Sequence, residues 1–184
     1  GTYLSKNVYK TPGKLLDLGC GRGEYVKVFS DLNFDSFGTD ISPKSLEYSK
    51  GYNISVMDFE KDEFPYEKDS FDFVFSKSVI EHMRNPMALL KMSYDSLKLG
   101  GTAVIMTPSW IHNYKAAFYI DHTHVTPFTK TSLCDALKMA GYKDVNIEYF
   151  YQLPALWKHP WLKPLSKITS FIPIPYAPLN DVPW

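Results

Sequence analysis

Leu15-Leu16-Asp17-Leu18-Gly19-Cys20-Gly21-Arg22-Gly23 is an apolar run that ends in three alternating glycines. The apolar part predicts a buried strand, and the glycines predict a tight turn after it. Glycine has no Cβ, so the backbone there tolerates positive φ and another molecule can approach the main chain closely. The amides that follow would open the N-terminus of a helix. The pattern therefore predicts a site for a nucleotide-type cofactor after the first strand.

The spacing of the glycines distinguishes two kinds of cofactor site. The dinucleotide fingerprint is G-x-G-x-x-G. Here Gly23 comes one residue early, and Glu24 stands where that fingerprint has Gly or Ala. An acid two positions before the first glycine and a compact G-x-G-x-G resemble the first motif of class I S-adenosylmethionine-dependent methyltransferases. The resemblance implies a turn that binds S-adenosylmethionine through Asp17, Gly19, Cys20, Gly21 and Gly23.

The composition is that of one globular domain. The chain has 184 residues, 45% hydrophobic and 22% charged, which is enough for a core. Twenty basic and twenty acidic residues cancel, so no nucleic-acid partner is expected. Cys20 and Cys134 do not suggest a disulfide staple and fit a reducing compartment. Because no apolar run could span a membrane and no leader is readable, the expected location is cytoplasmic.

Strand-like and helix-like segments alternate from Lys14 to about Tyr151, which predicts a Rossmann-like α/β fold. Its sheet is expected to be open and mainly parallel, with helices on both faces, and no final antiparallel strand is readable. The expected strands are 14–20, 36–41, 55–59, 71–76, 102–107 and 144–151. The expected helices are 24–32, one opened by Ser42-Pro43, 86–99 capped by Gly100-Gly101, and 131–140 stopped by Gly141. A domain at 1–151 is followed by a Pro- and Trp-rich tail at 152–184.

Two further acids follow expected strands. Asp40 closes the second strand about twenty residues past the glycine turn, where a carboxylate can accept hydrogen bonds from ribose hydroxyls. Asp58 closes the third strand, where its side chain and the next amide could contact adenine. A single acid after a strand is more often a turn or cap residue, so the convergence with the glycine turn carries the argument. The cofactor set thus also includes Asp40, Ile41, Asp58 and Phe59. For Asp17 the alternative is that it hydrogen-bonds loop amides and holds the turn.

A second stretch extends the resemblance over roughly residues 15–149. The run Phe71-Asp72-Phe73-Val74-Phe75-Ser76-Lys77-Ser78-Val79-Ile80-Glu81-His82-Met83 and the later Leu97-Lys98-Leu99-Gly100-Gly101 resemble a pattern of small-molecule methyltransferases of the ubiquinone and menaquinone type. That pattern is "D-x-V…EH…L-K-P-G-G", and Leu99 replaces its usual proline. The resemblance implies that Ser76, Lys77 and Ser78 line the methionine end of the cofactor and that Glu81 and His82 face the pocket.

His82 is accordingly a candidate catalytic residue. The alternative is that Glu81-His82 caps a helix or packs under the sheet. Some relatives bind a divalent metal through an E-x-x-E-H run. Ser78 replaces the first Glu of that run here, so no metal is expected.

The segment 109–130 is too long for an ordinary connection, which predicts a substrate loop. It is rich in aromatic and histidine residues, and His122 with His124 could form a metal pair or supply a general base. The run Asp121-His-Thr-His-Val-Thr-Pro-Phe-Thr, which continues through Leu133, Leu137 and Ala140-Gly141-Tyr142, resembles the "H…F-T…L…L…A-G-F" stretch of the same methyltransferases. The resemblance implies that the loop helps to close the acceptor site. His122 is the preferred catalytic base; otherwise it fixes the loop geometry.

The sequence thus predicts an enzyme that transfers a methyl group from S-adenosylmethionine to a small molecule with an apolar or ring-shaped part. The in-line displacement chiefly needs alignment of acceptor, methyl and sulfur, and a histidine base helps a hydroxyl acceptor. One alternative is a non-catalytic cofactor-binding domain that docks through the aromatic tail. Another is a membrane-surface methyltransferase on a lipid-linked acceptor, with tryptophans and lysines of the tail at the interface. The sequence does not identify the acceptor or an oligomeric state.

Overall fold

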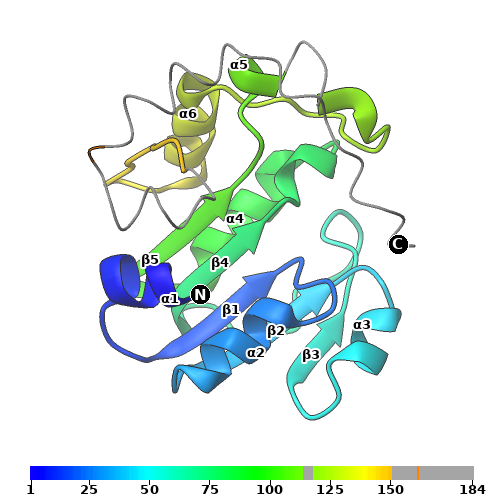
Figure 1. The fold of residues 1–184 in the computed structure, drawn as a ribbon, viewed down its shortest axis with the longest axis vertical. Coiled ribbons are helices and arrows are strands. Elements are labelled where there is room, and N and C mark those ends of the chain that lie inside the picture. Colours follow the sequence, from blue (N-terminus) through cyan, green and yellow to red (C-terminus); the bar gives the residue numbers. More distant parts are fainter. Residues whose placement is uncertain (114–117, 151–160, 162–184) are drawn as a thin grey trace. The chain divides into compact units, whose positions relative to one another are not determined.

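The computed structural model describes residues 1–113, 118–150 and 161 (Figure 1). The chain divides into two units, Gly1–Ile147 and Glu148–Trp184. Of the expected tail at 152–184, only Trp161 lies in the described part, and it is exposed. The division expected at 151/152 stays a prediction, and the fold below is that of the first unit.

Five parallel strands form the sheet of the described residues, in the order β3-β2-β1-β4-β5. They are β1 (Lys14–Leu18), β2 (Asp35–Asp40), β3 (Asn53–Val56), β4 (Phe71–Lys77) and β5 (Leu97–Met106). The chain builds outward from β1 to β3 and then returns to the other side of β1. This reversal lies between β1 and β4, the position at which open α/β sheets bind ligands beyond their carboxyl ends. The expected parallel sheet is confirmed.

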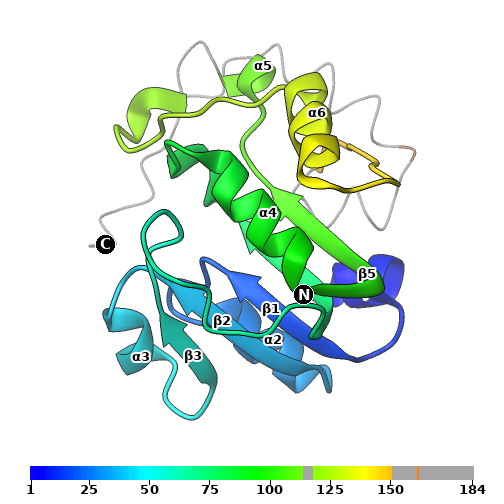
Figure 2. The ribbon, with the colours of Figure 1, turned by 180° about the vertical axis from the view of Figure 1, so that it is seen from behind.

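Helices cover both faces of this sheet. In Figure 1, α2 (Glu24–Asp31) lies in front of the strands, and in Figure 2, turned by 180°, α4 (Pro86–Ser96) does. Leu15 packs in a cluster with Phe29 of α2, whereas Leu16 packs in a second cluster with Leu90 of α4. Successive side chains of β1 are buried on opposite faces, as in an interior parallel strand. The expectation of helices on both faces is confirmed.

The remaining helical segments are short except for α6. They are α1 (Thr2–Leu4), the π-helix η1 (Ser5–Tyr9), α3 (Lys44–Tyr48), the 3-10 helix η2 (Ile80–His82), α5 (Trp110–Asn113), the 3-10 helix η3 (Phe118–Ile120) and α6 (Lys130–Ala140). A capping box of Thr129 and Ser132 begins α6, and Gly141 with φ of 120° ends it. The expected helix at 131–140 and its stop are confirmed. The helical segments before β1 were not expected.

Three expected boundaries are wrong by three residues or more. The strand expected at 55–59 ends at Val56, because the Asp58 amide donates to the Asp62 carboxylate at 2.7 Å and starts a turn. The helix expected at 86–99 ends at Ser96, so Gly100-Gly101 does not cap it. The strand expected at 102–107 begins at Leu97 instead, as β5, and its pairing with β4 shifts between Phe71 and Phe73. The two glycines lie in that irregular stretch of strand.

The strand expected at 144–151 is also absent from its described part. Residues 144–150 form no strand, and Tyr151 lies outside the described residues. Val145 and Ile147 still pack against the core cluster on the α4 side. Alternating burial therefore produced a strand-like pattern without any neighbouring strand to supply hydrogen bonds.

Candidate functional site

The glycine turn crosses the carboxyl end of β1. Gly19, Gly21 and Gly23 have φ of 81°, 55° and 74°, in the left-handed region that favours glycine. The amides of Gly19 and Cys20 donate to the carbonyl of Thr39 in β2, at 2.8 and 2.9 Å. Helix α2 begins directly after Gly23. The tight turn and the helix start expected from the sequence are confirmed.

The Asp40 carboxylate joins this turn to the end of β2. Its Oδ2 accepts from the Gly21 amide at 2.7 Å, and its Oδ1 accepts from the Ser42 amide at 2.9 Å. Each carboxylate oxygen has a further lone pair for a ligand hydroxyl. The neighbouring Ile41 is 63% exposed and offers an apolar surface beside this acid. Asp40 is thus both a structural clamp of the turn and a free acceptor.

Asp17 lies beneath the turn, only 1% exposed. Its Oδ2 has no hydrogen-bond partner, so this oxygen does not hold loop amides. Burial, with a smaller contribution from the charge of Asp40, raises the pKa of Asp17 from 3.8 to about 8. The protein therefore keeps a carboxyl group that is protonated at neutral pH at the point where the ligand is expected.

Three buried polar atoms near the carboxyl ends of the strands lack a hydrogen-bond partner. Among the described residues, the buried side-chain oxygens or nitrogens without a partner are Asp17 Oδ2, Thr39 Oγ1 and Glu81 Oε1. They belong to β1, to β2 and to the segment after β4. Such groups are rare in folded proteins, and a catalytic role is one of the explanations for them. The residues present at this edge fit a polar cofactor.

Asp58 and Phe59 occupy the turn after β3. Asp58 Oδ2 lies 2.6 Å from the ammonium of Lys61, and Oδ1 accepts from the Glu60 amide at 2.9 Å. The Lys61 hydrogen bond, then that of the Glu60 amide, lowers the pKa of Asp58. The Phe59 ring is buried in the core, so only its backbone is available to a ligand. The adenine-binding role of both residues stays a prediction.

The three residues at the end of β4 differ in their surroundings. The Ser76 hydroxyl is buried and donates to the Leu18 carbonyl at 2.8 Å, which ties β4 to the end of β1. The Lys77 ammonium contacts the Tyr25 hydroxyl at 3.2 Å. Ser78 is exposed and has φ of 58°, a strained backbone conformation for a residue with a Cβ. Strain of this kind is concentrated at functional sites.

The cysteines carry no exposed reactive thiol at this turn. The thiols of Cys20 and Cys134 are both free. Burial raises the pKa of the Cys20 thiol, and Cys20 can contribute to a ligand site through its backbone alone.

Glu81 fastens the loop after β5 to the end of β4. Its carboxyl group is fully buried, and Oε2 accepts from the Thr107 hydroxyl at 2.9 Å. Burial raises the pKa of Glu81. Its backbone carbonyl accepts from the amides of Val125 and Thr126, at 2.8 and 3.0 Å. Glu81 therefore anchors the loop both by its side chain and by its backbone carbonyl.

His82 follows Glu81 and is connected to this loop. Its Nδ1 lies 2.8 Å from Thr123 Oγ1. The Thr123 hydroxyl and amide both donate to Asp121 Oδ1, at 2.5 and 2.9 Å. These two hydrogen bonds lower the pKa of Asp121. The arrangement links an ionised carboxylate to an imidazole through one hydroxyl group.

His124 completes a group that we call the histidine cluster: Glu81, His82 and His124. One side-chain oxygen or nitrogen of each lies within 4.8 Å of the others, and the two imidazole rings meet at 4.6 Å between centroids. His124 Nδ1 lies 2.6 Å from the Phe118 carbonyl. A carboxyl and two imidazoles can exchange protons or hold a cation. That no metal is bound stays a prediction.

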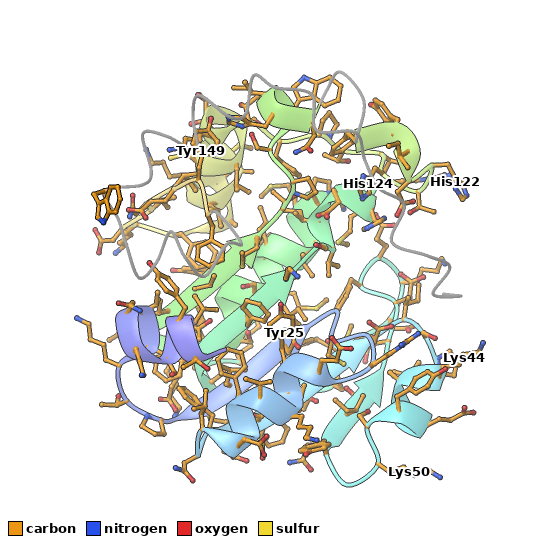
Figure 3. The ribbon with its side chains drawn as sticks, in the orientation of Figure 1. Tyr25, Lys44, Lys50, His122, His124 and Tyr149 are labelled. Atoms are coloured by element: carbon orange, nitrogen blue, oxygen red, sulfur yellow. The ribbon has the colours of Figure 1, made fainter. Side chains whose placement is uncertain are left out.

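His122 lies outside this cluster. It is exposed, and Figure 3 shows it at the outer edge of the loop while His124 lies closer to the strands. The role of His122 as base therefore stays a prediction without structural support. Sequence reasoning missed the contact of His82 with Thr123. The only local signal was the Asp121-x-Thr123 spacing, which is typical of a side chain that hydrogen-bonds two residues ahead.

Changing Asp17 to Asn is expected to alter how stability depends on pH. An acid whose pKa is about 8 when folded and 3.8 when unfolded keeps its proton on folding. The wild type therefore loses stability as pH rises between these values, at up to about 1.4 kcal/mol per pH unit. The Asn variant lacks this loss. Urea unfolding at about pH 5 and about pH 7.5 should show the variant gaining relative to the wild type at the higher pH. Parallel curves for the two proteins would contradict a protonated Asp17.

The fold and the edge just described define a class: Rossmann-like α/β proteins that take a nucleotide-type ligand beside a glycine turn. Comparison with known proteins narrows this class. Residues 2–147 match the family described as "Methyltransferase domain", so the chain belongs to that family. A solved structure of a SAM-dependent methyltransferase from Archaeoglobus fulgidus is 27% identical with a TM-score of 0.70. The match covers 85% of this chain and 73% of that one. The expected class I methyltransferase fold is confirmed.

Two curated relatives differ in what they act on. A ubiquinone biosynthesis O-methyltransferase of Cereibacter sphaeroides is 29% identical over 100 residues, covering 51% of this chain and 40% of the relative. A tRNA U34 carboxymethyltransferase of Desulfotalea psychrophila is 28% identical over 160 residues, covering 78% of this chain and 50% of the relative. The chain thus spans half or less of the length of these relatives.

No helix among residues 1–113, 118–150 and 161 is both long and apolar enough to cross a membrane.

Proposed function

We propose that the chain binds S-adenosylmethionine at the carboxyl edge beside β1 and transfers its methyl group to a small molecule with an apolar or ring-shaped part. The observation that carries this proposal is the buried Asp17 carboxyl group, whose Oδ2 has no partner, beneath a turn whose three glycines have left-handed backbone. Membership of the methyltransferase domain family supports the same proposal. The cytoplasmic location and a membrane-surface contact of the tail stay predictions.

Each part of the cofactor has residues suited to it. The glycine turn lets the backbone approach closely, and Asp40 accepts from the ribose hydroxyls. Ile41 offers its exposed side chain to the adenine. The backbone from Ser76 to Ser78 faces the methionine end. A cation brought near Asp17 would favour the ionised form of that buried acid.

The loop 109–130 supplies the acceptor side. Trp110, Phe118 and Tyr119 contact one another with ring centroids 5.1–5.9 Å apart. The Phe118 ring also lies 4.7 Å from the His124 ring, which connects this aromatic group to the histidine cluster. Aromatic surfaces favour other rings in offset or edge-to-face contact. This supports an acceptor with a ring.

When bound, S-adenosylmethionine supplies a methyl group whose C–S bond breaks, the electron pair staying on sulfur, while an acceptor lone pair forms the new bond and the acceptor proton leaves. The chain's own groups align the acceptor, exclude water and receive that proton. His82 is suited to the last task because it is partly exposed beside the loop.

A methyl-transfer screen tests the proposal. The protein is incubated with methyl-labelled S-adenosylmethionine and a panel of phenols, catechols, amines, sugars and unmodified tRNA. We expect label in a ring-bearing small molecule and none in tRNA, because the chain has no net positive charge. Label in tRNA alone would contradict the small-molecule acceptor. Cofactor binding without transfer to any acceptor would favour a docking module.

Changing Asp40 to Ala is expected to weaken cofactor binding by about 1–3 kcal/mol, because the ribose hydroxyls lose their acceptor. Calorimetry with S-adenosylhomocysteine measures the effect. Asp35, which begins β2 and is exposed, provides a matched control as Asp35→Ala. Equal affinities of the Asp40 variant and the wild type would show that Asp40 only clamps the turn.

A further inference from the structure

We propose that Asp121 and Thr123 are positioning residues that hold the His82 imidazole with its proton on Nδ1, so that Nε2 is the proton-accepting atom at the acceptor site. This inference rests on the proposed function for the identity of the reaction. The placement of the proton follows from the hydrogen bonds around His82.

The direction of each hydrogen bond follows from the groups involved. The Asp121 carboxylate is ionised at neutral pH and can only accept. The Thr123 hydroxyl, 2.5 Å from Asp121 Oδ1, therefore donates to it. A hydroxyl has a single proton, so toward His82 Nδ1, at 2.8 Å, it can only accept. The proton of a neutral His82 ring thus lies on Nδ1, and Nε2 keeps its lone pair.

The position of the proton on His124 follows in the same way, with a backbone carbonyl as the acceptor. A backbone carbonyl cannot donate, so His124 Nδ1 donates to the Phe118 carbonyl at 2.6 Å. Both imidazoles of the histidine cluster therefore carry the proton on the same ring atom. One Glu81 carboxylate oxygen belongs to the same group of atoms, and Oε1 of that carboxylate has no hydrogen-bond partner. The charged or titratable groups that face His82 are Glu81 from its own segment, and Asp121 and His124 from the loop.

The hydrogen bonds from Asp121 through Thr123 to His82 exist only when the loop is in place. Asp121 and Thr123 lie just before the residues that bind the Glu81 carbonyl. The loop is therefore anchored immediately beside the histidine whose proton it orients. A carboxylate that fixes the tautomer of a histidine base, and stabilises the imidazolium formed, is an arrangement known from other enzymes. Here a threonine hydroxyl stands between the two groups.

The proton balance of the step is then fixed. The acceptor O–H gives its proton to His82 Nε2, and the acceptor oxygen uses its lone pair for the new bond to carbon. His82 becomes an imidazolium, whose Nδ1–H still donates to Thr123 and is balanced by Asp121. Release of the Nε2 proton to water restores the starting tautomer.

Nitrogen NMR of the imidazoles tests the placement directly and needs no acceptor. Uniformly ¹⁵N-labelled protein is examined at alkaline pH, where histidines are neutral. The wild type is expected to show a protonated Nδ1 and an unprotonated Nε2 at His82. In Thr123→Val the two nitrogens are expected to exchange these signatures, because the acceptor of the Nδ1 proton is gone. Thr123→Ser keeps the hydroxyl and should retain the wild-type pattern.

Controls separate this result from other causes. Thr123 is exposed, so the valine variant should fold, and Thr123→Ala repeats the test with a smaller side chain. Thr131→Val, on the exposed surface of α6, controls for the change of residue type. A protonated Nε2 in the wild type, or an unchanged His82 in both Thr123 variants, would overturn the proposal.

Two further measurements keep the alternatives apart. The first is a titration with Mg²⁺ or Zn²⁺. If stoichiometric metal moves the Nε2 signals of both His82 and His124, these atoms bind a cation, and the proposed role of His82 as the base is overturned. Repeating the spectra with S-adenosylhomocysteine tests the proposed function separately. Absence of binding there would remove the methyl-transfer reaction while leaving the tautomer result intact.

Discussion

Replacing His82 with glutamine is expected to lower the turnover number by about 10²–10⁴-fold, the usual contribution of a general base. The affinity for S-adenosylhomocysteine should stay at the wild-type value, because His82 contacts the loop and not the glycine turn. Steady-state kinetics with the acceptor found in the screen measures the first quantity. Calorimetry measures the second.

The comparison with His122→Gln decides between the two histidines expected from the sequence. His122 is exposed at the outer edge of the loop, and we expect the loss of turnover to follow His82. A large loss in the His122 variant with normal turnover in the His82 variant would reverse the assignment. An equal fall in turnover and cofactor affinity on changing His82 would indicate a structural role.

Replacing Gly19 with alanine is expected to lower the free energy of unfolding by about 2–5 kcal/mol. The left-handed backbone costs about 1–2 kcal/mol for a residue with a Cβ. The added methyl would also lie 2.2 Å from Val79 Cγ2, and overpacking of this kind costs about 1–3 kcal/mol. Urea unfolding of the variant measures the sum.

Gly21→Ala is the matched variant that separates folding from binding. Its φ is 55°, and a Cβ added there meets nothing within 4 Å. We expect only the backbone cost of about 1–2 kcal/mol in stability. The added methyl would occupy the space that the cofactor needs, so its affinity should fall at least about tenfold, or about 1.4 kcal/mol. A Gly21 variant that binds normally would place the cofactor elsewhere.

Local signals predicted most of the fold because several of them agree at the same residues. At α6 the amphipathic pattern and the stop at Gly141 both indicate the same helix. Where only one signal was present, the prediction was wrong. The alternation of Val145 and Ile147 does not reveal whether a partner strand exists. The glycines at 100 and 101 do not reveal that Leu97 already pairs with Phe71.

In the candidate site, too, some residues were predictable from local signals and others were not. Asp17 and Asp40 were predictable because each stands at a strand end, and parallel strands bring their carboxyl ends to one edge. The partners of His82 were not, because Thr123 is 41 positions away and reaches it only through the folded loop. His122 and His124 look equivalent in sequence. Only the folded loop distinguishes the exposed ring from the one beside His82.

Calorimetric titration of the wild-type chain with S-adenosylhomocysteine and, separately, with NAD tests the central claim most directly. The arrangement of the glycine turn, Asp17 and Asp40 predicts one S-adenosylhomocysteine per chain, with affinity lost in Gly21→Ala, and no binding of NAD. Binding of NAD without any response to S-adenosylhomocysteine would contradict it.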